Sequence, residues 1–161
     1  MLATILINQD HPDWPDVEER IRAAVFATLH LLPSDDPSVP VVEVGITLTG
    51  DTQIQTYNRC YRGVDRPTNV LSFAMEDETT PLQRVPGEPR LLGDILLSYE
   101  TITHEATQQG KIFLDHLTHL VVHGVLHLLG FDHERSVQAA FEQESLEIAI
   151  LAGLGIGDPY A

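Results

Sequence analysis

Residues 123–133 read His-Gly-Val-Leu-His-Leu-Leu-Gly-Phe-Asp-His. Because His123 and His127 are four residues apart, an α-helix places both imidazoles on one face, one turn apart. Gly130 follows where a helix can end in a left-handed residue, so the chain can turn and bring His133 back toward the pair. Three neutral imidazoles with a fourth position left to water are typical of catalytic zinc. We therefore predict that His123, His127 and His133 bind one zinc ion.

Other interpretations of this stretch fit the residues less well. A structural zinc site is closed by four protein ligands, commonly cysteines, and this chain has only Cys60. The spacing is shared with metzincin proteases, which carry a glutamate directly after the first histidine and a methionine downstream. Here Gly124 follows the first histidine and no methionine follows His133. A peptidase is the second interpretation. A buried helix without metal would have to satisfy several imidazoles at once.

Length and composition indicate one folded domain over residues 1–161. The hydrophobic content is 43%, and no apolar run reaches membrane-spanning length. The apolar start of the chain is broken by Thr4 and lacks a basic flank, so it predicts a strand rather than a signal peptide. A single cysteine excludes an internal disulfide and suits a reducing compartment. We expect a cytoplasmic protein.

The charge balance limits the ways in which the chain could bind nucleic acid. The net charge is −15, from 24 acidic residues against nine lysines and arginines, which opposes general affinity for phosphate backbones. Arg59, Arg62 and Arg66 nevertheless lie within eight residues. They form either a solvated basic turn or one local patch for a phosphodiester.

The order of patterns along the chain predicts an α+β fold. Strands are expected at 3–7, 41–49, 70–75 and 92–97, and helices at 15–32, 51–61, 98–109, from about 113, and at 136–152. Asp51 or Thr52, and Ser98, are expected to cap two of these helices. The order implies a small mixed sheet of about four strands, covered mostly on one face by about five helices.

Three further residues near the motif have two interpretations each. His119 lies one turn before His123 and could coordinate the metal, although a hydrogen bond within the pocket or core is the simpler role. Asp132 could orient a ligating imidazole or be a turn residue. Asp94, in an apolar strand, is either a capping or turn residue or a group directed at the site.

Several blocks of the chain together resemble the YbeY family of bacterial rRNA-maturation endoribonucleases. Residues 119–133 resemble the family's histidine signature. Tyr61-Arg62-Gly63 through Asp65, followed by Pro-Thr-Asn-Val-Leu-Ser-Phe at 67–73, resembles a second, and Gly-Asp-Ile at 93–95 a third. Asp-Pro-Tyr at 158–160 is similar to the end of some members. The last helix departs from the family, because it carries Phe141 and lacks the usual methionine.

The resemblance implies a small α+β domain with a zincin-like site. It assigns the metal ligands to His123, His127 and His133, and an important arginine to Arg62. It implies a zinc-dependent endoribonuclease that cleaves single-stranded RNA, matures the 3′ end of small-subunit rRNA and serves ribosome quality control. The expected partners are rRNA and the ribosome or its assembly factors, without DNA or membrane. A non-catalytic, zinc-containing ribosome-assembly factor is a further alternative.

In the mechanism that this resemblance implies, zinc lowers the pKa of a bound water. Either the resulting hydroxide or the RNA 2′-hydroxyl attacks the phosphodiester. Arg62 would hold the scissile phosphate and offset its developing charge, while Arg59 and Arg66 are weaker candidates for guiding the strand.

Overall fold

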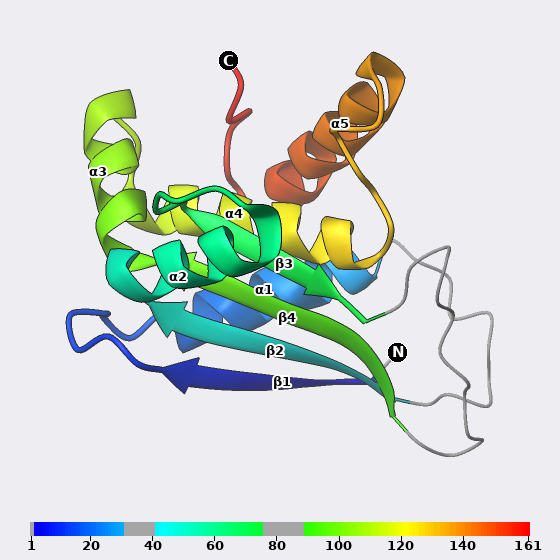
Figure 1. The fold of residues 1–161 in the computed structure, drawn as a ribbon. Helices are drawn as coiled ribbons and strands as arrows, with labels where there is room; N and C mark the ends of the chain where they lie inside the picture. Colours follow the sequence, from blue (N-terminus) through cyan, green and yellow to red (C-terminus); the bar gives the residue numbers. More distant parts are fainter. Residues whose placement is uncertain (1, 31–40, 76–88) are drawn as a thin grey trace.

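The structure is a computed structural model that describes residues 2–30, 41–75 and 89–161. Its strands form one four-stranded sheet in the order β1-β2-β4-β3 (Figure 1). β1 pairs with β2 in parallel, β2 with β4 in parallel, and β3 with β4 antiparallel. The strands are β1 (Leu2–Gln9), β2 (Val41–Thr49), β3 (Val70–Ala74) and β4 (Arg90–Ser98). The predicted mixed sheet is confirmed, with β3 at one edge.

Five helices occur in the described part of the chain, as predicted. They are α1 (Glu18–Leu29), α2 (Asp51–Arg62), α3 (Tyr99–Gln109), α4 (Phe113–Leu128) and α5 (Val137–Gly153). α1 begins later than expected because Trp14 is buried and its indole donates to the Thr49 carbonyl oxygen (2.9 Å), which holds the preceding segment against the end of β2. Residues 31 and 32, the expected end of this helix, lie outside the described residues.

One face of the sheet carries most of the core. Alternate residues of the strands, such as Ile46 and Ile95, are fully buried there, as period-two burial requires. α1 and α4 lie over this face, and α5 packs on the far side of α4 (Figure 1). α4 is buried along almost its whole length, so its sequence is apolar except at positions with a specific polar contact. None of the helices in the described ranges combines the length and apolar content that a bilayer crossing requires.

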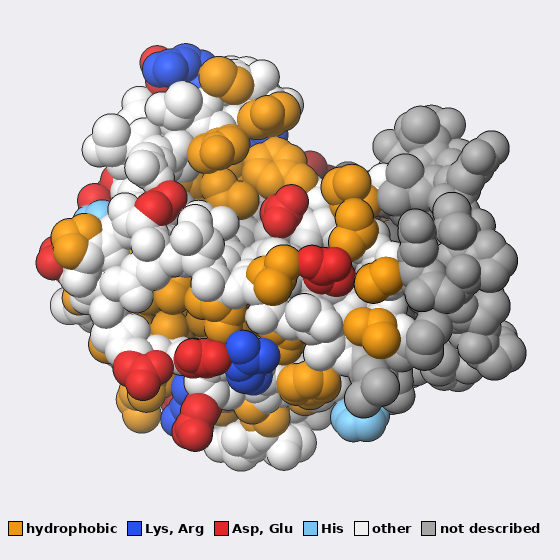
Figure 2. All heavy atoms as spheres, turned by 90° about the horizontal axis from the view of Figure 1, so that it is seen from below, with side chains coloured by type: hydrophobic (Ala, Val, Ile, Leu, Met, Phe, Trp, Pro, Cys, Tyr) orange, Lys and Arg blue, Asp and Glu red, His pale blue; other side chains and the backbone are white. Residues whose placement is uncertain are grey.

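The opposite face of the sheet is mostly open. α2 covers only a small cluster of Ile54, Leu71 and Leu96, with Phe73 packed against it. Elsewhere this face exposes apolar side chains, among them Leu6 and Leu91, and Figure 2 shows hydrophobic groups spread among acidic ones on it. The expected covering of mainly one face is therefore confirmed.

Ser98 stands at the N-cap position of α3, as expected, but its side chain makes no capping hydrogen bond. The cap expected from Asp51 or Thr52 is wrong, because the N-cap residue of α2 is Gly50, and the Asp51 N–H donates to the Glu100 carboxylate at 3.3 Å. The Ser98 hydroxyl donates to Asp51 Oδ1 at 2.6 Å, and the Thr101 hydroxyl donates to the same oxygen. The two residues expected to cap separate helices thus bind each other, because parallel β2 and β4 end side by side.

Candidate active site

The end of α4 brings the third histidine back toward the first. Gly130 has a φ of +100°, a conformation that glycine adopts without the strain a side chain would cause. Its N–H donates to the His127 carbonyl oxygen (3.0 Å), and that of Phe131 to Leu126 (3.1 Å). The chain reverses there, and the ring centres of His123 and His133 lie 5.0 Å apart. The predicted turn at Gly130 is confirmed.

The three histidines of the motif line one pocket together with Arg62. α4 supplies His123 and His127, the following turn supplies His133 and Glu134, and α2 supplies Arg62. The edge strand β3 closes the pocket with Val70, Leu71 and Ser72. Residues separated by more than 60 positions in the sequence therefore meet at one edge of the sheet.

Hydrogen bonds fix which ring nitrogen of two of these histidines carries hydrogen. His127 Nδ1 lies 3.2 Å from the Phe131 carbonyl oxygen, and His123 Nδ1 lies 3.2 Å from Glu147 Oε1. A carbonyl oxygen and an ionised carboxylate can only accept, so both Nδ1 atoms act as donors. In the neutral rings, Nε2 then keeps its lone pair, which is the form that binds a metal.

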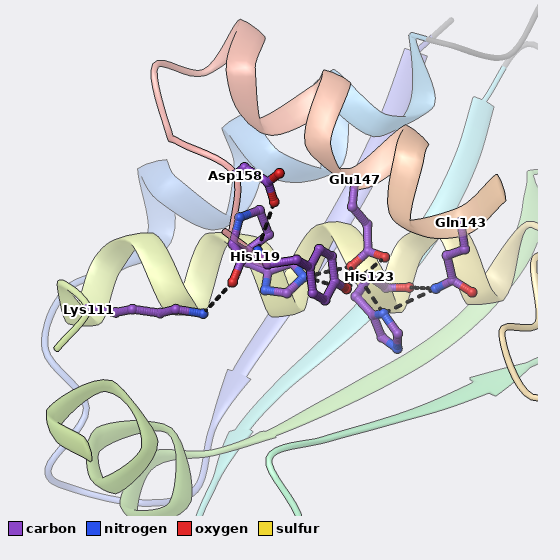
Figure 3. Close-up of polar contacts among 8 residues, drawn as sticks. Lys111, His119, His123, Gln143, Glu147 and Asp158 are labelled. Atoms are coloured by element: carbon purple, nitrogen blue, oxygen red, sulfur yellow. Dashed lines mark hydrogen bonds and ion pairs between the residues drawn. The ribbon is translucent and has the colours of Figure 1, made fainter. Parts of the chain in front are cut away.

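Glu147 is a completely buried carboxylate behind the pocket (Figure 3). Besides His123 it binds His119 Nε2 at 2.6 Å, and it accepts from the Tyr160 hydroxyl at 3.1 Å. Burial alone would raise its pKa, but the hydrogen bonds from His119 and His123 outweigh burial and hold the pKa at about 2. Burial and the charge of Glu147 raise the pKa of Tyr160, so its hydroxyl stays protonated and donates.

Sequence reasoning missed Glu147 and Gln143 as members of the site. Gln143 Nε2 lies 3.1 Å from His123 Nδ1, and its own Oε1 is buried with no partner in the part of the chain that the structure describes. The opposite amide orientation would direct Oε1 toward the Nδ1–H donor. One feature of the sequence could have indicated them. Gln143 and Glu147 are polar residues four positions apart on the buried face of α5, which continues with Ile150 and Leu151.

The segment that carries Tyr160 is held by Lys111 and by a hydrogen bond of its own. The Lys111 ammonium donates to the Pro159 carbonyl oxygen at 2.9 Å (Figure 3), and the Tyr160 N–H donates to Asp158 Oδ1 at 2.8 Å. The Asp-Pro-Tyr block noted in the sequence therefore supplies a hydroxyl to the buried carboxylate.

His119 lies beside the pocket rather than in its lining. Its Nε2 is engaged by Glu147, and its Nδ1 is buried without a partner in the described residues. The structure thus gives His119 the hydrogen-bonding position rather than one of a metal ligand. His116 is also hydrogen-bonded to a carboxylate, because its Nε2 lies 3.0 Å from Glu105 Oε1. Burial lowers the pKa of His116, which favours the neutral ring.

The two aspartates considered near the motif do not contact its histidines. Asp132 Oδ1 accepts from the Glu134 N–H at 2.9 Å, which is the local contact of a turn residue. Asp94 pairs with Phe73 across β3 and β4, next to Ile95, which faces α4. Because neighbouring residues of a strand alternate between faces, Asp94 lies on the sheet face away from the histidines.

Of the three clustered arginines, the structure brings only Arg62 to the pocket. Its side chain is 48% exposed, and its Nη2 lies 3.6 Å from Glu134 Oε1. Arg59 is exposed and lies 3.5 Å from Asp65, and Arg66 is exposed outside the lining. Sequence reasoning missed Glu134, although it directly follows the last histidine of the motif.

Gly124 occupies the position of the protease glutamate, and the packing explains why it carries no side chain. A Cβ there would lie 3.0 Å from Ile95 Cδ1 and 3.1 Å from Ser72 Oγ. The backbone of α4 approaches the sheet closely at this point, so even a Cβ would require the side chains of Ile95 and Ser72 to shift by a few tenths of an ångström. The helix–sheet contact therefore favours glycine where a protease carries glutamate.

Zinc fits this pocket in residue type and in the spacing of one pair. Imidazoles on a tetrahedral ion, with Zn–N of about 2.0–2.1 Å, have ring centres roughly 5 Å apart, which matches His123 and His133. Among residues 2–30, 41–75 and 89–161, however, no three His, Cys, Asp or Glu side chains are grouped closely enough to hold an ion. At least one ligand side chain must move to complete a zinc site, which stays a prediction.

Comparisons with known proteins agree with the resemblance in the sequence. The family model described as endoribonuclease YbeY matches residues 7–155. A protein of that name from Magnetococcus marinus is 56% identical over 146 residues, covering 84% of this chain and 99% of the relative. Another, from Paramagnetospirillum magneticum, is 51% identical over 168 residues, covering 99% and 98%.

A solved structure shares the fold at lower similarity. The solution structure of TM1509 from Thermotoga maritima has a TM-score of 0.58 and 21% identity, covering 94% of this chain and 91% of that one. Together, fold and relatives define the class as an α+β protein related to hydrolytic nucleases. The chain belongs to the YbeY family. The matched region includes every residue that lines the histidine pocket.

Proposed function

We propose that this protein is a zinc-dependent, single-strand-specific endoribonuclease that acts in rRNA processing and ribosome quality control in the cytoplasm. Its site of action would be the 3′ end of small-subunit rRNA. Membership of the YbeY family supports the reaction. The observation that carries the proposal is the pocket in which His123, His127 and His133 meet Arg62.

The three histidines and Arg62 each have a definite part in this reaction. The Nε2 atoms of His123 and His127, with His133, would hold the zinc ion. When bound, zinc supplies a Lewis acid that stabilises charge on the phosphate and lowers the pKa of water. Arg62 presents a planar guanidinium that can bind two phosphate oxygens at once. Either water or the 2′-hydroxyl of RNA would then attack the phosphodiester.

Specificity for unpaired RNA follows from where the pocket lies. It is sunk between the end of α2 and the edge strand β3, and a single strand can bend its backbone into such a site. A duplex would have to unpair first. Arg59 and Arg66 could guide the strand toward Arg62, and the ribosome or its assembly factors would present the RNA.

The phosphate role of Arg62 is tested by replacing it with glutamine. Arg62→Gln should lower kcat/KM on a single-stranded oligoribonucleotide by about 100- to 1000-fold, with zinc content and melting temperature unchanged. Arg22→Gln is the control, because it removes an exposed arginine of α1 that pairs with Glu18. Cleavage by Arg62→Gln at the wild-type rate would contradict the proposal.

Two other functions compete with this one. A metalloprotease would cut casein and leave RNA intact, and it would need a base that Gly124 does not supply. A non-catalytic ribosome-assembly factor would bind zinc without cleaving either substrate, and it would keep its cellular activity after Arg62→Gln. Assays of one metal-verified preparation against RNA and casein distinguish the three.

A further inference from the structure

Three aromatic side chains form an exposed cluster next to the histidine pocket. Tyr57 and Tyr61 of α2 are stacked, with ring centres 6.0 Å apart and planes 12° apart. Phe73 of β3 meets Tyr61 edge-on at 5.3 Å and lies 6.4 Å from Tyr57. The cluster thus joins the two elements that border the pocket, and we call it the aromatic cluster.

Packing of the small core under α2 does not account for all of this cluster. That core consists of Ile54, Leu71 and Leu96, and the partly buried Phe73 packs against it. Tyr61 is 69% exposed and Tyr57 is 43% exposed. Most of the Tyr61 ring therefore faces solvent, although burying an aromatic ring is favourable.

The sequence positions of the cluster connect it to the reaction centre. Tyr61 directly precedes Arg62, and Phe73 directly follows Ser72. Arg62 and Ser72 line the pocket, whereas Phe73 pairs with Asp94 and therefore lies on the other face of β3 from Ser72. The cluster thus lies on the far side of the edge strand from the histidines, and Arg62, at the end of α2, joins it to the pocket. A nucleic-acid strand whose phosphate lies at Arg62 would have its neighbouring nucleotides within reach of these rings.

We propose that the aromatic cluster, chiefly Tyr61, is a stacking platform for an unpaired base next to the phosphate held by Arg62. This inference rests on the proposed function. Exposed rings beside arginines are the combination that binds single strands, because the rings stack on bases while the arginines hold the backbone. Arg59 and Arg62 lie on the same last turns of α2, in a protein whose net charge is −15.

The platform is tested by binding, so that the result does not depend on cleavage. Fluorescence anisotropy would measure Kd for labelled oligoadenylate, oligouridylate and an abasic ribose-phosphate oligomer, with EDTA present. Stacking makes oligoadenylate the tightest ligand, because purines stack best. Tyr61→Leu should weaken oligoadenylate binding by about five- to hundredfold and leave binding of the abasic oligomer unchanged. Tyr61→Phe keeps the ring and should bind as wild type.

Each other outcome overturns the platform. Wild-type affinity of Tyr61→Leu for oligoadenylate would make the cluster a packing feature or a surface for a protein partner. An equal loss for the abasic oligomer would show that Tyr61 acts through the backbone contacts instead of a base. The endoribonuclease proposal is tested separately, by adding zinc to the bound RNA. If the RNA is bound but not cleaved, that proposal fails.

Discussion

The imidazole of His123 is held from behind by the buried carboxylate of Glu147, at 3.2 Å. Such a partner fixes the ring orientation, keeps hydrogen on Nδ1 and leaves Nε2 as the donor to a metal. The same carboxylate binds His119 and Tyr160, so its position is itself fixed from several directions. The geometry of the proposed ligand thus depends on a residue that does not line the pocket.

Replacing Glu147 with glutamine should lower zinc affinity by about ten- to hundredfold, because the amide holds the His123 ring less strongly. Competition with a zinc-binding dye would measure the affinity. Glu105→Gln is the matched control, since Glu105 holds buried His116 at 3.0 Å but contacts none of the proposed ligands. Equal zinc affinity in Glu147→Gln and wild type would remove Glu147 from the site.

If Arg62 binds the substrate phosphate as proposed, Glu134 would compete with the substrate for it. Its carboxylate lies 3.6 Å from the guanidinium inside the pocket, where a phosphate would have to displace it. Glu134→Gln should therefore lower KM for single-stranded RNA a few-fold, with kcat unchanged, in steady-state cleavage assays. The control is Glu142→Gln, which removes an exposed carboxylate of α5. A large fall in kcat would instead assign Glu134 the role of the missing general base.

At the scale of elements, the pocket depends on how closely β3 lies against β4. Gly93 of β4 has a φ of +141°, and a Cβ there would lie 2.0 Å from the Phe73 carbonyl oxygen. Backbone cannot move aside as a flexible side chain can. The pairing of these two strands therefore requires glycine at this position, and β3 in turn closes the pocket with Ser72.

Gly93→Ala should lower the free energy of unfolding by about 2–4 kcal/mol, because the strands must separate to admit the methyl group. Urea denaturation monitored by circular dichroism would measure this. Gly153→Ala is the control at the end of α5, where a Cβ would meet nothing within 4 Å, and it should change stability by less than about 1 kcal/mol. Similar stabilities of the two variants would contradict the close strand approach.

The sequence predicted those parts of the fold and site that depend on local patterns. The fold class followed from strand and helix periodicity, and the approach of His133 to His123 followed from the glycine turn at Gly130. The Glu147 contacts could not be predicted, because they form only when α5 packs on α4. The expected capping hydrogen bonds do not form for the same reason, since Asp51 and Ser98 meet through the pairing of β2 and β4.

At the scale of the whole molecule, an acidic protein with few phosphate contacts should bind RNA with a weak salt dependence. Each neutralised phosphate of a single strand contributes a slope of about 0.7 in log Kd against log salt. Two or three contacts from Arg62, Arg59 and Arg66 predict a total slope of roughly 1.5–2. Anisotropy titrations in increasing KCl would measure it, with duplex DNA as a ligand that should bind poorly. A slope above about 4 would require a more extensive phosphate surface.

In the proposed mechanism, His123, His127 and His133 hold a zinc ion that is required for RNA cleavage. The most direct measurement strips the protein with EDTA, restores zinc in steps and follows both bound metal and cleavage of a labelled single-stranded RNA. We expect no cleavage without metal and full cleavage at one zinc per chain. In His127→Ala we expect neither stoichiometric zinc binding nor cleavage. Full cleavage by the stripped protein, or stoichiometric zinc binding by His127→Ala, would contradict it.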